Sequence, residues 1–194
     1  MNMIQRITAA IDPALPVAVE DERFLDETAA HHRAAAVLIP ITDRIEPGVI
    51  LTQRPDNLRS HAGQVAFPGG KIDETDNGPI SAALREAEEE LAIPACKVKV
   101  IGATDDYFSG SGYRITPVLG MIPPDLKLIP NPGEVEDWFE VPLSFLLNPA
   151  NAQRKTTLWM GRERQYYDMD WQGRRIWGVT AGIIANLARR MEAV

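Results

Sequence analysis

The chain has 194 residues, 45% of them hydrophobic, and a formal net charge of −7. A chain of this length can bury one sizeable core, so we expect one domain over residues 1–194 and not two. The negative charge argues against nucleic acid and anionic membrane as partners. No apolar run approaches the roughly 18 residues of a membrane span, and the first residues lack the basic and apolar parts of a secretory signal, so we expect a cytosolic protein.

The N-terminal residues are predicted to form a helical extension over about residues 1–33. Ile4, Ile7 and Ile11 recur at helical spacing, and Pro13 ends that segment. A second helix is expected from about 22 to 33, ahead of the first strand.

The middle of the chain contains short apolar runs of strand length. The first two are joined by a turn that contains Pro47 and Gly48, which indicates a hairpin. Pro117 lies inside the last run and implies an edge strand or a bulge there, because proline cannot donate to a sheet ladder. The predicted strands are 35–41, 49–54, 64–67, 98–104 and 113–122.

The C-terminal part is predicted to be a hairpin followed by a helix. The hairpin is rich in aromatic residues (Trp159, Tyr166, Tyr167 and Trp171), and its turn is expected at Gly173. An amphipathic helix over 180–191 closes the chain. Strands flanked by helices predict an α/β fold with a mixed sheet.

One predicted helix has an apolar side and an acidic side. Gly78 and Pro79 supply its start, and it ends before Pro94. Glu86, Glu89 and Glu90 stand at i, i+3 and i+4, so their carboxylates share one face and repel one another. A solvated acidic face is one interpretation. A bound divalent cation is the other, and oxygen ligands without His or Cys favour Mg²⁺ or Mn²⁺, which often share their ligand shell with substrate phosphates.

A basic stretch precedes this helix. Between residues 53 and 72 the cationic side chains are Arg54, Arg59 and Lys71, with His61 in addition and Asp56 as the one acid. Arginine can bind phosphate oxygens through two parallel hydrogen bonds, and backbone N–H groups around Gly69 and Gly70 can add donors. These residues are therefore candidates for phosphate binding. The alternatives are solvated surface arginines, and for His61 a role in orientation or structure, which we prefer to direct catalysis.

The sequence REAEEELAI at residues 85–93 resembles the second half of the signature of the Nudix hydrolases. Ala92 stands where that family has Gly, a position just past a helix that often needs positive φ, at a cost of roughly 1 kcal/mol for Ala. The first half departs more: Asn77 stands where the family has Glu, and Gly70 lies one residue too far upstream. The nearby acids that could substitute are Asp73, Glu74 and Asp76.

The upstream run over 51–70, which contains RSHAGQVAFPGG, extends the resemblance to one subfamily, the bacterial coenzyme A pyrophosphatases. This resemblance implies a Nudix fold, an α/β/α sandwich with a mixed sheet and a loop-helix-loop catalytic motif. It also implies metal-dependent hydrolysis of a diphosphate linkage, in coenzyme A or acyl-coenzyme A, to 4′-phosphopantetheine and adenosine 3′,5′-bisphosphate.

By the same resemblance each acidic residue receives a role. Glu86, Glu89 and Glu90 would hold Mg²⁺ or Mn²⁺, and Glu89 would also take a proton. Arg85 would orient a neighbouring carboxylate. Glu134 would supply a further base or metal ligand from a loop after the signature, whereas Glu136 is interpreted as a surface acid.

Two other functions stay open. A broader Nudix pyrophosphatase would act on ADP-ribose, NADH or a nucleoside triphosphate with the same metal helix. A Nudix-fold module that binds a nucleotide without hydrolysis is the second, although repelling carboxylates have no use in it. Tyr107 and Phe108, in the loop 105–112, would either stack on an adenine ring or belong to a plain connection. A homodimer is compatible with the family.

Overall fold

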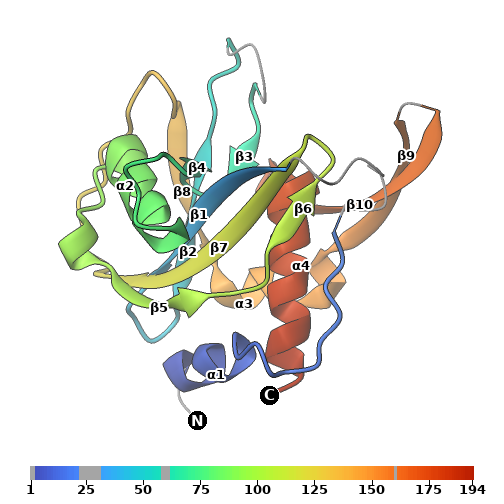
Figure 1. Ribbon diagram of the computed structural model, residues 1–194, viewed down its shortest axis with the longest axis horizontal. Coiled ribbons are helices and arrows are strands. Elements are labelled where there is room, and N and C mark those ends of the chain that lie inside the picture. Colours follow the sequence, from blue (N-terminus) through green and yellow to red (C-terminus); the bar gives the residue numbers. More distant parts are fainter. Residues whose placement is uncertain (1–2, 22–31, 58–61, 160) are drawn as a thin grey trace.

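The structure is a computed structural model that describes residues 3–21, 32–57, 62–159 and 161–194 (Figure 1). Four α-helices, eleven strands and two short 3₁₀ helices are present in the described part of the chain. In order they are α1 (Met3–Ala10), β1 (Arg33–Thr42), β2 (Gly48–Gln53), β3 (Val65–Ala66), β4 (Gly69–Lys71), α2 (Pro79–Leu91), η3 (Ala95–Lys97), β5 (Lys99–Ala103), β6 (Tyr107–Ser109), β7 (Tyr113–Ile122), β8 (Asp137–Pro142), α3 (Leu143–Leu146), η4 (Pro149–Asn151), β9 (Gln153–Trp159), β10 (Arg162–Trp171), β11 (Arg174–Trp177) and α4 (Gly178–Glu192).

The main sheet is mixed and is built around one long parallel pair. β1 and β7 run parallel from Arg33↔Tyr113 to Thr42↔Ile122, and all other pairs are antiparallel. The strand order is β3-β2-β1-β7-β5, with β4 also on β1, β6 on β7 and β8 on β2. A second sheet, β9 to β11, is a three-stranded meander that packs beside α4.

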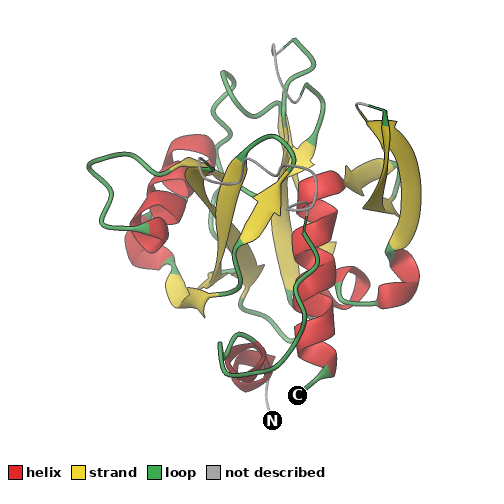
Figure 2. Ribbon diagram, turned by 45° about the vertical axis from the view of Figure 1, so that its right-hand side comes forward, coloured by secondary structure: helices red, strands yellow, loops and turns green. Residues whose placement is uncertain are grey.

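Helices cover both faces of the main sheet (Figure 2). Side chains alternate along β1, so Ala36 and Leu38 pack under α2, while Ile39 and Ile41 belong to the core cluster that contains α1 and α4. Because both faces are buried, β1 is a continuous apolar run and not an alternating one. The α/β/α arrangement expected from the sequence is confirmed. No helix of the described residues is long and apolar enough to cross a membrane.

Most of the predicted elements are present. The predicted helix at 22–33 lies mainly outside the described residues, and Arg33 begins β1. The aromatic hairpin has three strands: Gly173 lies in the turn between β10 and β11. Tyr107 is 5% exposed, in strand β6, and packs against Gly182 of α4, so it lies in the core and not in an open loop.

Of the two alternatives predicted for Pro117, the edge strand is wrong, because β7 lies inside the sheet. The other was a bulge, and the irregularity in the β5–β7 pairing lies at Val100 and Gly102, opposite Gly120 and Leu119. On its far side the partner of β7 changes from β5 to β6: Ala103 pairs with Val118 and Tyr107 pairs with Ile115. Pro117 falls in the gap, where its carbonyl accepts a hydrogen bond from the Thr104 N–H at 2.9 Å. The missing proline N–H therefore interrupts no ladder on that side.

The end of α2 explains the residue that departs from the family signature. Ala92 has φ 54° and ψ 39°, and its N–H donates to Glu88 O at 2.9 Å while the Ile93 N–H donates to Ala87 O at 3.3 Å. The bond from Ala92 N–H to the carbonyl four residues back is the αL cap motif, and the fully buried Ile93 follows it. The expected positive φ is confirmed.

Replacing Ala92 with Gly is therefore expected to stabilise the protein by about 1 kcal/mol, because glycine reaches this conformation without the steric cost that alanine meets. Urea unfolding measures the change. As a matched control, Glu88→Gly, at an exposed position inside the same helix, should destabilise by about 1 kcal/mol. Two changes of the same sign would contradict this account of the cap.

Candidate active site

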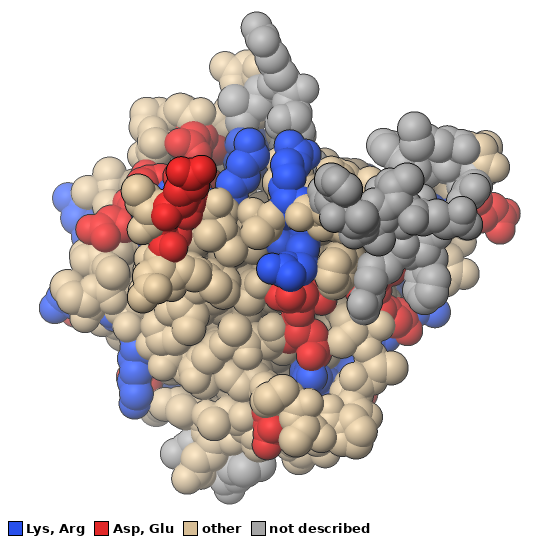
Figure 3. Space-filling view, in the orientation of Figure 1, with Lys and Arg blue, Asp and Glu red and all other residues tan. Residues whose placement is uncertain are grey.

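Three carboxylates meet beside the sheet. Glu86 and Glu90 project from α2, and Glu134 comes from the loop before β8; carboxylate oxygens of the three lie within 4.8 Å of one another. Figure 3 shows that acidic side chains gather over α2 on the face in view. Three negative charges this close repel unless protons or a cation reduce their charge. Oxygen ligands from carboxylates alone fit Mg²⁺ or Mn²⁺.

Glu90 is the buried member of this group, with 3% of its side chain exposed. Its Oε2 accepts a hydrogen bond from the Gly69 N–H at 3.3 Å, and Arg54 Nη1 lies 3.9 Å from its Oε1. Burial raises the pKa of Glu90 to about 8, and the charges of Glu134 and Glu86 add to the rise, against the opposite effects of Arg54 and the Gly69 amide. A buried carboxylate of this kind is stabilised in its ionised form when a cation binds it.

Glu86 stands next to the chain at Gly70. A Cβ atom on Gly70 would lie 2.4 Å from Glu86 Oε1, so only glycine leaves room for this carboxylate. Burial raises the pKa of Glu86, although the ion pair with Arg85 opposes that change. The two glycines expected to meet phosphates are thus in contact with carboxylates: Gly69 donates to Glu90, and Gly70 makes space for Glu86.

Arg85 forms hydrogen bonds to several of the carboxylates near this group. Its guanidinium donates twice to Asp76, from Nε to Oδ1 at 3.1 Å and from Nη2 to Oδ2 at 2.9 Å. Nη1 donates to Glu86 Oε1 at 2.9 Å and to Glu89 Oε2 at 3.1 Å, and Nη2 also reaches the Lys71 carbonyl at 3.0 Å. Arg85 therefore bonds to the carboxylates of Asp76, Glu86 and Glu89. Of the three acids that could replace the missing signature Glu, Asp76 is the one that receives the paired bonds.

We expect Asp76→Asn to lower turnover by about 10- to 100-fold, because Arg85 loses its charged anchor and no longer holds Glu86 in place. The concentration of Mg²⁺ that gives half-maximal rate should rise with it, and a metal titration of the rate measures both. Asp73→Asn is the matched control: that side chain is 63% exposed and 3.6 Å from Arg85 Nη2, so it should change the rate less than about twofold. Equal losses in the two variants would refute the special role of Asp76.

The remaining predicted residues lie in different places. Glu89 lies outside the group of three: its side chain is 53% exposed and bonds to Arg85. Lys71 is exposed at the end of β4. Arg54 contacts Glu90, and its Nε is buried without a hydrogen-bond partner among the described residues. Arg59 and His61 lie outside the residues that the structure describes.

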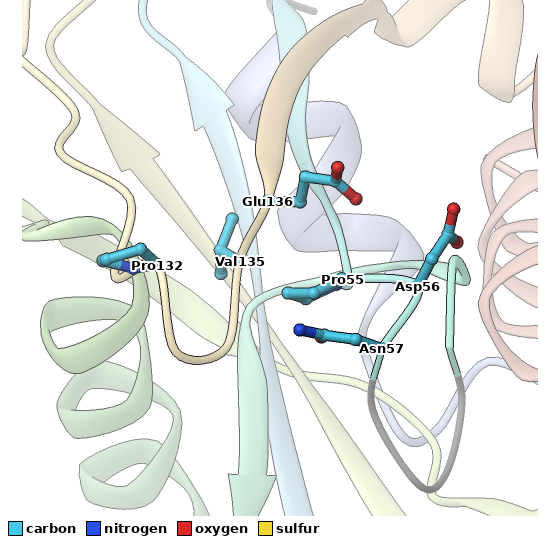
Figure 4. Close-up of a pocket in the computed structure, with 6 residues that line it drawn as sticks. All are labelled: Pro55, Asp56, Asn57, Pro132, Val135 and Glu136. Carbon is cyan, nitrogen blue, oxygen red and sulfur yellow. The ribbon is translucent and has the colours of Figure 1, made fainter.

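An open cavity of about 410 Å³ is lined in part by the loop that carries Glu134, and it was not predicted from the sequence. Figure 4 shows its two walls, one from the segment after β2 and one from the loop before β8, which also carries Glu134. The lining residues are Pro55, Asp56, Asn57, Pro132, Val135 and Glu136. No local signal marks this cavity, because its walls are about 75 residues apart along the chain and are brought together by the β2–β8 pairing.

Comparisons with known proteins agree with this fold. Residues 31–160 match the NUDIX domain family. Proteins named "Uncharacterized Nudix hydrolase NudL" from Escherichia coli (strain K12) and Shigella boydii serotype 4 are each 49% identical over 166 residues, which is 81% of this chain and 82% of the relative. The crystal structure of RenU, a Nudix hydrolase from M. smegmatis, matches with a TM-score of 0.50 and 23% identity over 59% of this chain and 73% of that chain, and supports the fold. The chain belongs to the NUDIX domain family, and its relatives are Nudix hydrolases.

Proposed function

We propose that this Nudix hydrolase cleaves a diphosphate linkage with the help of a divalent cation, Mg²⁺ or Mn²⁺. The observation that carries the proposal is the convergence of Glu86, Glu90 and Glu134 within 4.8 Å, with Glu90 buried. A binding module without hydrolysis gains nothing from such repulsion. The carboxylate set is what a hard cation and a phosphate-rich substrate require.

The residues of the site have three separate tasks in this proposal. Glu86, Glu90 and Glu134 hold the cation, which when bound neutralises phosphate charge and activates water. Arg85 orients Glu86. Glu89, exposed and hydrogen-bonded to Arg85 at the edge of the group, is the candidate to take the proton from the attacking water.

We propose coenzyme A or an acyl-coenzyme A as the substrate, with 4′-phosphopantetheine and adenosine 3′,5′-bisphosphate as products. The support is the resemblance of residues 51–70 to the coenzyme A pyrophosphatases. The buried Nε of Arg54, which has no hydrogen-bond partner among the described residues, supports Arg54 as a candidate donor to a phosphate oxygen. Lys71, Arg59 and His61 are further candidates to bind phosphates.

The experiment that tests the function is incubation of the purified protein with Mg²⁺ and coenzyme A, with ADP-ribose and dGTP in parallel, and identification of products by mass spectrometry. Release of 4′-phosphopantetheine well ahead of turnover on the other two supports the proposal. A preference for ADP-ribose or dGTP would support the proposed metal chemistry but exclude coenzyme A as the preferred substrate. Binding without any turnover would favour the non-catalytic module.

Glu89→Gln separates proton transfer from metal binding. Because Glu89 lies outside the group of three, the variant is expected to lose turnover by about 10²- to 10⁴-fold while it keeps most of the thermal stabilisation by Mg²⁺. Thermal unfolding with and without Mg²⁺, beside the rate, makes the distinction. Loss of the Mg²⁺ effect together with the rate would instead make Glu89 a metal ligand.

A further inference from the structure

Arg174 of the C-terminal meander bonds to both strands that lead into the cavity. Its Nη1 donates to Gln53 Oε1 at 3.0 Å, and its Nη2 donates to Asp137 Oδ2 at 2.6 Å. The guanidinium carbon also lies 4.3 Å from the centre of the Phe139 ring on β8. One arginine from β11 thus bridges β2 and β8.

Gln53 and Asp137 are the last pair of the β2–β8 ladder. Directly beyond them the two strands diverge into the walls of the cavity, Pro55 to Asn57 on one side and Pro132 to Glu136 on the other. The Glu136 N–H donates to Gln53 O at 2.9 Å, which is the last backbone bond between them. Arg174 therefore ties the two walls together at their base.

The turn that presents Arg174 is tight. Trp171 pairs with Arg174 across a two-residue loop in which Gln172 and Gly173 both have positive φ, 53° and 81°. This is the type I′ geometry of short hairpins, and it fixes the direction in which β11 leaves the turn. Glycine suits the second position, while Gln172 is strained at the first.

The chemistry of the cavity differs from that of the basic stretch. Its six described lining residues include two carboxylates, Asp56 and Glu136, and no Lys or Arg. Phosphate is repelled by such walls. Carboxylate and amide oxygens beside proline and valine surfaces instead accept hydrogen bonds from an uncharged ligand that carries N–H groups.

We propose that this cavity binds an uncharged, N–H-bearing part of the substrate and that Arg174 is the positioning residue that holds its walls. The proposal rests on the proposed hydrolysis of a diphosphate linkage. Two parts of coenzyme A have this chemistry, the amide-bearing pantetheine arm and the adenine base. Arg174 acts on substrate binding and not on the bond-breaking step, because its hydrogen bonds go to Gln53 and Asp137 and not to the carboxylates of Glu86, Glu90 and Glu134.

Steady-state kinetics on the purified protein test this role. Arg174→Ala should raise KM about fivefold or more while kcat changes less than about twofold, and the inhibition constants of uncharged competitors should rise by the same factor. Pantetheine and adenosine are the competitors, and the one that competes with the substrate in the unchanged protein and weakens in the variant occupies the cavity. Arg174→Lys keeps the charge but not the two-pronged geometry, so it should give an intermediate KM.

Arg175→Ala is the matched control. Arg175 is the next residue on the same strand, but it bonds to Asp168 and Tyr166 within the meander. It should leave KM and both inhibition constants unchanged. A second check is the pair Arg174→Ala and Gln53→Ala, whose effects on KM should be less than additive because they remove the same contact.

Three results would overturn the proposal. Arg174 is not the positioning residue if Arg174→Ala and Arg175→Ala have the same KM, or if the loss of activity in Arg174→Ala is entirely in kcat. The cavity assignment falls if neither pantetheine nor adenosine competes with the substrate. If the unchanged protein hydrolyses no diphosphate at all, the proposed function fails separately, and calorimetric binding of pantetheine and adenosine to the same variants still decides the role of Arg174.

Discussion

Replacing Glu90 with Gln is expected to reduce Mg²⁺-dependent turnover by at least about a thousandfold and, at the same time, to make the metal-free protein more stable at pH 8. The loss of rate follows because Glu90 is the buried member of the carboxylate group, so its charge is the one that water screens least. The gain in stability follows from the pKa of the same carboxyl group.

The direction of the pKa shift of Glu90 determines whether the free energy of unfolding rises or falls with pH. The pKa of Glu90 rises from its usual 4.5 to about 8, so the folded protein keeps a proton that the unfolded chain loses as the pH increases. The stabilisation is complete below about pH 4.5 and disappears as the pH rises through about 8. The metal-free protein should therefore lose free energy of unfolding over this window, by roughly 2–4 kcal/mol, and Gln at this position should remove most of that loss.

Thermal and urea unfolding in EDTA between pH 5 and pH 9 measure the effect, followed by the same series with Mg²⁺. The unchanged protein should gain more from Mg²⁺ at pH 8 than at pH 5.5, because at the lower pH the cation must displace a proton. Glu88→Gln, on the exposed side of α2, is the control and should alter neither the rate nor the pH profile. If Glu90→Gln kept both its Mg²⁺ stabilisation and its turnover, Glu90 would not be a ligand.

The sequence predicted the elements whose signals are local. The helix that carries the acids begins at Pro79 and is followed by Ala92 in a left-handed conformation, because proline at a start and a residue with positive φ at an end act within one turn. The continuous apolar sequence of β1 likewise indicates a strand that is buried on both faces. These features require no knowledge of distant residues.

The site depends on contacts that local signals do not contain. Spacing along α2 puts Glu86, Glu89 and Glu90 on one face of the helix. In the structure the Glu89 carboxylate is exposed and bonds to Arg85. The third member of the group is Glu134, from a loop 44 residues after Glu90. Only the family resemblance indicated Glu134. The role of Asp76 was one of three options until its paired bonds to Arg85 distinguished it.

A second large effect is expected at a contact between α4 and the segment before β6, where Asp105→Asn should lower the free energy of unfolding by about 2–3 kcal/mol. Asp105 binds Arg190 of α4 in a paired ion contact, with Nη2 2.7 Å from Oδ1, and the Arg190 side chain is 4% exposed. Without the aspartate charge, a guanidinium stays buried with no counter-ion. Part of Asp105 is exposed, so the effect falls toward the lower end of the range for such pairs.

Arg190 also connects the N-terminal helix to the rest of the fold. The loss of stability in Asp105→Asn should therefore affect this helix first. Arg190 Nη1 donates to the carbonyl oxygens of Ala10, at the end of α1, and of Asp12 beyond it, at 2.9 Å and 3.1 Å. A helix C-terminus favours a nearby cation, so these bonds and the ion pair support one another. In Asp105→Asn, limited proteolysis should therefore release the first residues of the chain before the sheet is cut.

Asp106→Asn is the matched control, since Asp106 is the adjacent residue but is 37% exposed and lies 3.6 Å from an Arg114 that is itself half exposed. It should cost less than about 1 kcal/mol. Replacing both partners, as Asp105→Leu with Arg190→Met, should recover much of the stability lost in Asp105→Asn, because no buried charge is then left without a partner. If Asp105→Asn and Asp106→Asn were equally mild, the buried arginine would have to find its compensation from the carbonyl groups alone, and α1 would be held by its apolar contacts through Ile7 and Ile11.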